Sequence, residues 1–175
     1  MRIARRLFIV PLANDAHGKG TLINALLSQG LGTKSPRQKG VRHLKTPFGQ
    51  TIDGYIFVRS YQEKEKKKYG NVVDALDGND AYWGSRDLII FPSHIDKAGT
   101  SDMVDAAHGA GFDAICLAVI VNDQDRQTYK DVFKLNWDER WTVNNPYCDD
   151  DDSAGHQCKA LGHDLWTRIS STLMF

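Results

Sequence analysis

The chain has few cysteines, no net charge and no long hydrophobic run. Its three cysteines (Cys116, Cys148 and Cys158) are too few and too scattered for a disulfide framework, which favours a reducing compartment. Lys plus Arg and Asp plus Glu balance at 22 each, so no overall field attracts nucleic acid or an anionic membrane. The apolar run near the start is only about seven residues long, too short for a signal-peptide core or a membrane span. We therefore expect a cytoplasmic protein without a membrane partner.

Strand-like and helix-like segments alternate along the 175 residues, a length that suits a single domain over 1–175. Apolar runs rich in β-formers predict strands at 7–13, 52–60, 87–94, 112–121 and 139–144. Helical spacing and capping residues predict helices at 21–29, 61–76, 101–108, 126–135 and 154–173, with Ser101 or Asp102 capping the third. This alternation predicts an α/β fold, a three-layer α/β/α sandwich with a mostly parallel sheet of about five strands.

The first strand and the first helix enclose the most informative loop. It reads Ala13-Asn14-Asp15-Ala16-His17-Gly18-Lys19-Gly20-Thr21. A phosphate loop needs backbone amides turned toward one point, a helix N-terminus behind them and a lysine for the outer phosphates. These needs predict phosphate contacts from Asn14, Asp15, His17, Gly18, Lys19, Gly20 and Thr21, with the Thr21 hydroxyl near Mg²⁺. Ala13 stands where a Walker A motif has its first glycine, so a ligand-free glycine-rich turn is the alternative.

Residues Gly18-Lys19-Gly20-Thr21 are identical to the loop of adenylate-kinase-like proteins, and here the chain resembles the P-loop NTPases, in particular the nucleoside-phosphate kinases. The resemblance covers these four residues, the strand before them, the helix after them and the alternating order of elements. It implies a parallel sheet of order 2-3-1-4-5, ATP or GTP with Mg²⁺ as cofactors, and a catalytic role for Lys19.

Two further expectations come from this resemblance. The family usually has a metal-supporting aspartate at the end of the third strand, where this chain has Pro92-Ser93-His94, so Ser93 is the predicted stand-in and Asp96 is the nearest aspartate. Kinases of this group also fold a lid over the phosphates. The corresponding lid-like segment here is 122–140, and Arg126 and Arg140 are its predicted catalytic cations.

A basic stretch follows the first helix. Five basic residues and no acid lie between 34 and 45, and the prolines and glycines around them predict a loop over 34–49. Arg37, Lys39 and Arg42, together with Arg59 after the second strand, are predicted to bind a small anionic second substrate; a solvated loop is the alternative. Nucleic acid is possible here but not favoured. The candidate bases, which the sequence does not rank, are Asp15, His17, Asp53 and His94.

Cys148, His156, Cys158 and His163 do not have the spacing of a zinc site. The leading hypothesis is therefore a nucleotide-kinase-like protein that transfers the ATP γ-phosphoryl group to a small anionic or hydroxyl acceptor. A nucleotide-dependent switch or accessory binding module is the first alternative. Nucleic-acid end processing is the weaker one.

Overall fold

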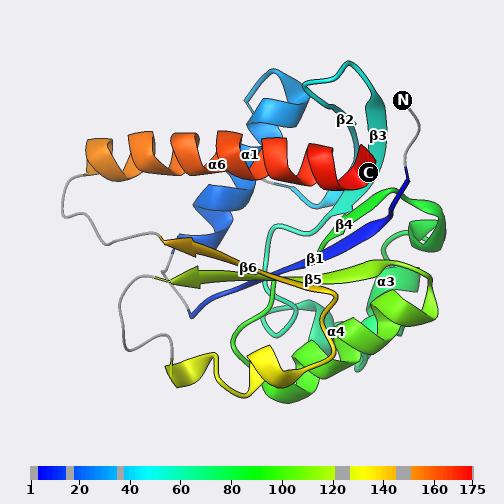
Figure 1. The fold of residues 1–175 in the computed structure, drawn as a ribbon. Helices are drawn as coiled ribbons and strands as arrows, with labels where there is room; N and C mark the ends of the chain where they lie inside the picture. Colours follow the sequence, from blue (N-terminus) through cyan, green and yellow to red (C-terminus); the bar gives the residue numbers. More distant parts are fainter. Residues whose placement is uncertain (1–3, 15–17, 35–37, 121–126, 145–150, 175) are drawn as a thin grey trace.

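The structure is a computed structural model that describes residues 4–14, 18–34, 38–120, 127–144 and 151–174, and the side chains of 151–155 and 158 lie outside this description. Within these ranges a six-stranded sheet forms the middle layer (Figure 1). Its strands are β1 (Leu7–Leu12), β2 (Gly40–Lys45), β3 (Thr51–Ile56), β4 (Leu88–Ile90), β5 (Asp113–Ile120) and β6 (Glu139–Asn144). Their order is β2-β3-β4-β1-β5-β6, and only the β2–β3 pair is antiparallel.

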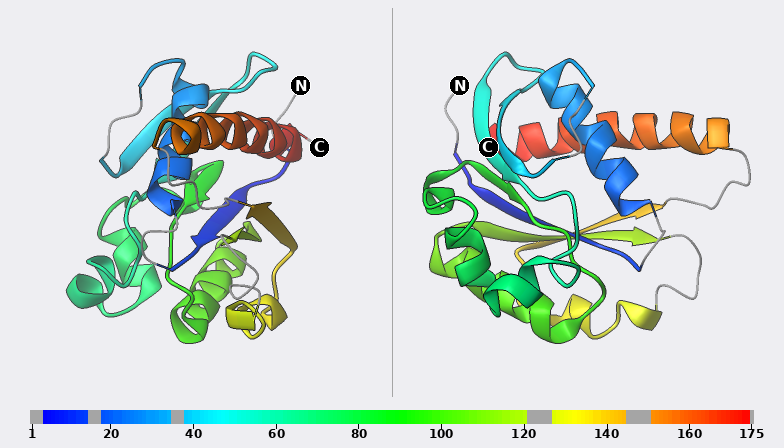
Figure 2. Two further views of the ribbon diagram at one scale, coloured as in Figure 1. Left: turned by 90° about the vertical axis from the view of Figure 1, so that its left-hand side faces the viewer. Right: turned by 180° about the vertical axis from the view of Figure 1, so that it is seen from behind.

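Helices cover both faces of this sheet (Figures 1 and 2). On one face lie α1 (Lys19–Leu31) and α6 (Asp151–Met174), and on the other lie α3 (Val72–Asp77) and α4 (Lys97–Gly109). The short α2 (Glu65–Tyr69) and 3₁₀ turns at Trp83–Ser85 and Val132–Lys134 complete the elements. The expected α/β fold with a mostly parallel sheet is confirmed, with six strands in place of about five.

The central strand β1 is buried along its whole length. Leu7 and Ile9 pack in the core cluster under α1 and α6, while Phe8 and Val10 pack in the cluster on the α3 and α4 side. Alternation of side chains between two buried faces explains why this strand is a continuous apolar run. It also places the end of β1, and the loop that follows, in the middle of the sheet.

The expected loop over 34–49 was wrong, because it contains β2. Gly40 to Lys45 pair antiparallel with Ile56 to Thr51. Leu44 is fully buried and packs on Gly30 of α1, whereas His43 and Lys45 are exposed. Because β2 lies at the edge of the sheet, charged side chains on it discourage pairing with other chains. The same charged side chains make its sequence resemble that of a polar loop.

The other predicted helices differ in their boundaries. The expected helix over 61–76 is two short helices, because Gly70 leaves the helical region with a φ of 82° and the Asn71 side chain accepts from the Asp74 amide at 2.8 Å to cap α3. The N-cap of α4 is Asp96, not Ser101 or Asp102. The described part of 126–135 ends in a 3₁₀ turn instead of continuing as an α-helix.

Among the described residues, none of the helices has the length and apolar character needed to cross a bilayer.

Candidate phosphate-binding site

Helix α1 begins directly after Gly18, in the segment that follows β1. Gly18 is the N-cap of α1 and has a left-handed φ of 82°, a conformation that favours glycine. The first helical hydrogen bond runs from the Leu22 amide to the Gly18 carbonyl at 2.9 Å. Helix geometry therefore leaves the amides of Lys19, Gly20 and Thr21 without intrahelical acceptors, and the N-cap residue Gly18 has no side chain to cap them. The half-charge of the helix N-terminus favours an anion at this point.

The ammonium group of Lys19 is held at this same place. Its Nζ donates to the carbonyl oxygens of Ala13 at 3.0 Å and of Ser93 at 3.1 Å. Ala13 follows β1 and Ser93 follows β4, which is the strand next to β1 in the sheet. The amide of Ser93 also donates to the Pro11 carbonyl at 3.0 Å, so the two chain segments stay paired beyond the end of β4. The lysine is thus fixed where two central strands end and α1 begins.

Ser93 contacts Lys19 through its backbone carbonyl, and its hydroxyl makes other contacts. Its side chain is fully buried, and Oγ donates to the His94 carbonyl at 2.9 Å and accepts from Gln62 Nε2 at 2.8 Å. The proton and one lone pair of the hydroxyl are therefore used within the protein, and the metal role of Ser93 stays a prediction. Thr21 is exposed in the first turn of α1, where its hydroxyl can reach a bound ligand.

The aspartate that follows Ser93 most closely in the sequence is Asp96. Asp96, the nearest aspartate in sequence, is the N-cap of α4 and accepts from the amides of Ala98 and Gly99, each at 3.3 Å. Partial burial would raise the pKa of Asp96, but the hydrogen bonds from Gly99 and Gln62 and the charge of Lys66 together lower it. In the described ranges no three or more His, Cys, Asp or Glu residues cluster as a metal site would require. The residues present fit a phosphate group better than a metal cage.

Gln62 is a site residue that the sequence did not reveal. Its Oε1 accepts from the His94 amide at 3.0 Å, while its Nε2 donates to Ser93 Oγ. It follows β3 and thereby ties the segment after that strand to the end of β4. No motif marks this glutamine, because its role depends on two segments about thirty residues apart meeting in the fold.

Tyr129 supports the site from the opposite side of β1. Its hydroxyl is buried, 2.6 Å from the Leu12 carbonyl oxygen and 2.9 Å from that of Val119. It belongs to the predicted lid-like segment 122–140, of which residues 127–140 are described. Val132 and Trp137 of this segment are also buried in the core. The described part therefore packs as a wall of the domain, not as a lid, and Arg126 lies outside the described residues.

Arg140 does not reach the loop. It is the second residue of β6 and pairs with Cys116, whereas the carboxyl end of β6 is Asn144. Its guanidinium donates to the carbonyls of Phe133 at 2.7 Å and Leu135 at 2.8 Å. This arginine holds the 3₁₀ turn in place, so the structure does not bring it together with Lys19.

Two of the predicted acceptor-binding cations share a pocket. Lys39 and Arg59 line a cavity of about 320 Å³ just past the carboxyl end of β3. Lys39 Nζ forms a 2.6 Å ion pair with Glu65, whose side chain is only 5% exposed. Arg59 is exposed and forms no hydrogen bond or ion pair with another described residue. Of the predicted acceptor-binding cations, Arg59 is therefore the one available to a ligand in this pocket, which Lys64 also lines.

The other predicted cations are less well placed. Arg42 folds back along β2, where its guanidinium donates to the carbonyls of Gln38 at 2.6 Å and Val41 at 2.8 Å. Arg37 lies outside the described residues.

The candidate bases separate by position. Asp53 lies in the first half of β3 and contacts His43 Nδ1 at 2.6 Å, away from the carboxyl ends of the strands. His94 follows Ser93 directly, and its Nε2 is 3.7 Å from Glu63 Oε1. Asp15 and His17 lie outside the described residues, so His94 is the one described candidate on the side of Lys19.

The described cysteine side chain, that of Cys116, plays no part in this geometry. Cys116 is buried in mid-strand, where burial raises the pKa of its thiol to about 12. The residues of the rejected zinc pattern are described only in part, since Cys148 and the side chain of Cys158 lie outside the described residues.

Comparison with known proteins adds no relative: no protein-family model matches the chain, and no match was found among curated proteins or among solved structures.

Proposed function

We propose that this protein binds a nucleoside triphosphate through its phosphate groups at residues 13–21. The observation that carries the proposal is the position of Lys19, whose ammonium lies at the N-terminus of α1 between the carbonyls of Ala13 and Ser93. The ammonium charge of Lys19 therefore lies beside the amides of the first helical turn and the positive end of the helix dipole. All three would attract an anion to the same place. Such an arrangement suits the outer phosphates of a nucleotide.

The order of the strands supports the same proposal. The five parallel strands run β3-β4-β1-β5-β6, which is 2-3-1-4-5 when only these five are numbered along the chain. This is the order that the resemblance to nucleoside-phosphate kinases implies. The loop follows the central strand β1, and ligands of open α/β sheets bind at the carboxyl ends of the strands. A P-loop fold is accordingly part of the proposal.

For the reaction, we propose transfer of the γ-phosphoryl group of ATP or GTP to a small anionic acceptor bound near Arg59. Phosphoryl transfer needs positioning and charge stabilisation more than covalent chemistry by the protein. Lys19 and the amides of α1 would stabilise the charge on the phosphates, and Arg59 would bind the anionic group of the acceptor. His94 is placed to accept a proton if the acceptor presents a hydroxyl.

Mg²⁺ would accompany the nucleotide, and when bound it offsets the negative charge of the phosphates. Thr21 is the described residue whose oxygen could hold it, with phosphate oxygens and water as the remaining ligands, because Mg²⁺ usually keeps several waters.

A second function has one observation in its favour. The end of β4 carries Ser93 with an occupied hydroxyl, and the carboxylate of Asp96 is taken up in capping α4. A protein with this arrangement can bind a nucleotide as a signal, without transferring its phosphoryl group. That nucleotide-dependent switch or accessory module is the alternative.

One assay separates the two. The full chain is incubated with γ-labelled ATP, Mg²⁺ and pooled nucleoside monophosphates, and labelled products are separated. A kinase labels an acceptor with the wild type and with the control Lys134→Ala, a change at a 66% exposed lysine of the Val132–Lys134 turn, but not with Lys19→Ala. Arg59→Ala should raise the KM for the acceptor roughly 10- to 100-fold, as expected for losing a charge-assisted hydrogen bond. ATP binding without any labelled acceptor would contradict the kinase and leave the switch.

A further inference from the structure

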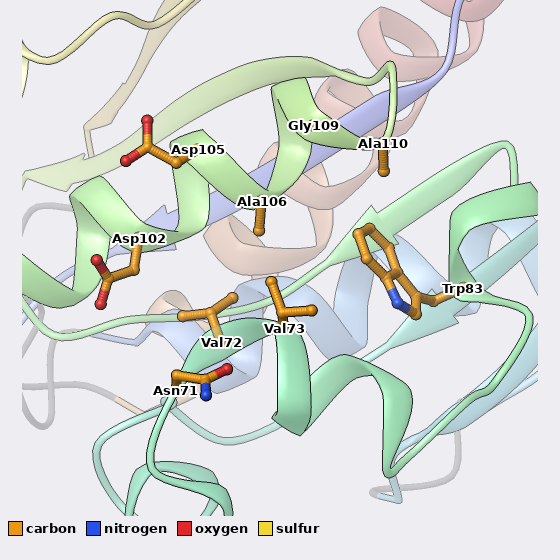
Figure 3. Close-up of a pocket in the computed structure, with 9 residues that line it drawn as sticks. All are labelled: Asn71, Val72, Val73, Trp83, Asp102, Asp105, Ala106, Gly109 and Ala110. Carbon is orange, nitrogen blue, oxygen red and sulfur yellow. The ribbon is translucent and has the colours of Figure 1, made fainter.

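A groove between α3 and α4 lies on the face of the sheet opposite α1 and α6, and the nucleotide proposal makes no use of it (Figure 3). Its volume is about 580 Å³, within the range of specific binding sites. It is lined by Asn71, Val72, Val73, Trp83, Asp102, Asp105, Ala106, Gly109 and Ala110.

The floor of the groove is apolar and rigid. Val72 and Ala106 are buried in the core, so the two helices are locked against each other at this point. The Trp83 indole stacks on Phe112, with ring centroids 5.9 Å apart and planes 13° apart, and its Nε1 donates to Asp77 at 2.7 Å. Only 7% of Trp83 is exposed, so the indole forms a fixed part of the groove floor, and Val73 is the side chain with apolar surface to cover.

Two unusually exposed apolar side chains lie at or next to the groove. Val73 lines the groove and is 45% exposed, and Tyr82, next to Trp83 in the chain, is 73% exposed. Among the described residues they are two of only three large hydrophobic side chains with such exposure. An apolar patch of this kind, bordered by charges, is typical of an interaction site.

The charges that border the groove are all negative. Asp102 and Asp105 line it from α4, and none of the described lining residues is Lys or Arg. Both aspartates are exposed, and neither forms a hydrogen bond or ion pair with another described residue. Figure 3 shows Asp102 at the end of the groove near Asn71, with Trp83 at the other end and the valines of α3 between them. Because the whole chain has no net charge, this field is local to the groove.

We propose that this groove binds a basic amphipathic segment of a partner protein. Apolar side chains of the segment pack on Val73 and Trp83, and a Lys or Arg at one end of it pairs with Asp102 and Asp105. This is recognition of an amphipathic segment in a groove between two helices, in which apolar anchors give affinity and the charged end sets the orientation. The proposal is independent of nucleotide binding.

The test begins with a library of random 12-residue peptides displayed on phage, selected on the full-length protein. Enriched peptides are synthesised, labelled and titrated by fluorescence anisotropy. We expect them to combine two or three apolar residues with Lys or Arg, and to shift the backbone amide signals of 71–73, 83 and 102–110 in NMR spectra of the full chain. Asp102→Asn/Asp105→Asn and Val73→Ser should each weaken binding roughly tenfold, whereas the control Asp164→Asn, at an 83% exposed aspartate of α6, should not.

Three results would overturn the proposal. The first is that no peptide is enriched, or that the enriched peptides are acidic or uncharged. The second is equal binding to the wild type and to both groove variants. The third is a concentration-dependent dimer in sedimentation velocity that Val73→Ser abolishes, which would make a second copy of the chain the occupant.

Discussion

Replacing Tyr129 by Phe tests whether the segment after β5 is a wall of the domain. The change removes one hydroxyl and keeps the ring, which stacks on Phe133 with centroids 5.3 Å apart. The lost hydroxyl is fully buried, 2.6 Å from the Leu12 carbonyl oxygen and 2.9 Å from that of Val119, at the ends of two central strands. Leaving a buried carbonyl without its donor costs about 1–3 kcal/mol. We therefore expect Tyr129→Phe to lower the free energy of unfolding by about 2 kcal/mol.

Urea unfolding followed by circular dichroism measures this loss as a lower midpoint at an unchanged slope. For a chain of this size the same loss lowers Tm by about 4–8 °C. The matched control is Tyr82→Phe, since Tyr82 is 73% exposed and its hydroxyl forms no hydrogen bond with a described residue. This change should alter stability by less than about 0.5 kcal/mol. If Tyr129→Phe were as neutral as this control, the segment would be loosely attached, as a lid is, and the packing described above would be wrong.

Three further outcomes follow from buried ionisable groups. Arg86→Met should lower the free energy of unfolding by about 3–5 kcal/mol in the same urea assay, because it leaves Asp80, whose side chain is 6% exposed, without its ion pair. A loss below about 1 kcal/mol would show that the pair is not buried. The hydrogen bond from Arg86 lowers the pKa of Asp80 in the folded state. The stability that this contributes is present above the unfolded pKa of 3.8 and is lost as pH falls from there through the lower pKa of the folded state. Arg86→Met should therefore flatten the acid side of the stability–pH curve, and an unchanged curve would contradict this assignment. The thiol of Cys116, whose pKa burial raises to about 12, should resist iodoacetamide at pH 8 until urea is added, as peptide mass spectrometry can show; rapid labelling of the native chain would mean that β5 is accessible.

The parts of the fold that could be predicted are those that a short, local sequence pattern determines. The continuous apolar run at 7–13 and the helical spacing from Leu22 to Leu27 predict β1 and α1 almost to their ends, and Gly32 ends the helix in the left-handed region. By contrast, β2 is a strand because it pairs with β3 and because Leu44 packs on α1. Neither reason is visible in a stretch dominated by basic residues, glycine and proline.

The same distinction holds at the candidate site. Gly18 and Lys19 are candidates because a phosphate loop is a local pattern, and Ser93 because the resemblance implies a metal-supporting residue at the end of the third strand. The structure brings Lys19 and the Ser93 carbonyl together, and their binding roles stay predictions. Gln62 and Tyr129 could not, since each contacts a strand end far away in sequence. Arg140 was assigned by its place along the chain, but β6 carries it toward the opposite end of the sheet from Lys19.

The central claim is that residues 13–21 bind the phosphates of a nucleotide through Lys19, and isothermal titration calorimetry with ATP and Mg²⁺ tests it most directly. Wild type and Lys134→Ala should bind with the same affinity, and Lys19→Ala, shown by its thermal unfolding to be folded, should bind at least about 100-fold more weakly, as expected for losing a charge-assisted contact to a phosphate. ATP binding by the Lys19→Ala protein at wild-type affinity, or no ATP or GTP binding by the wild type, would contradict the claim.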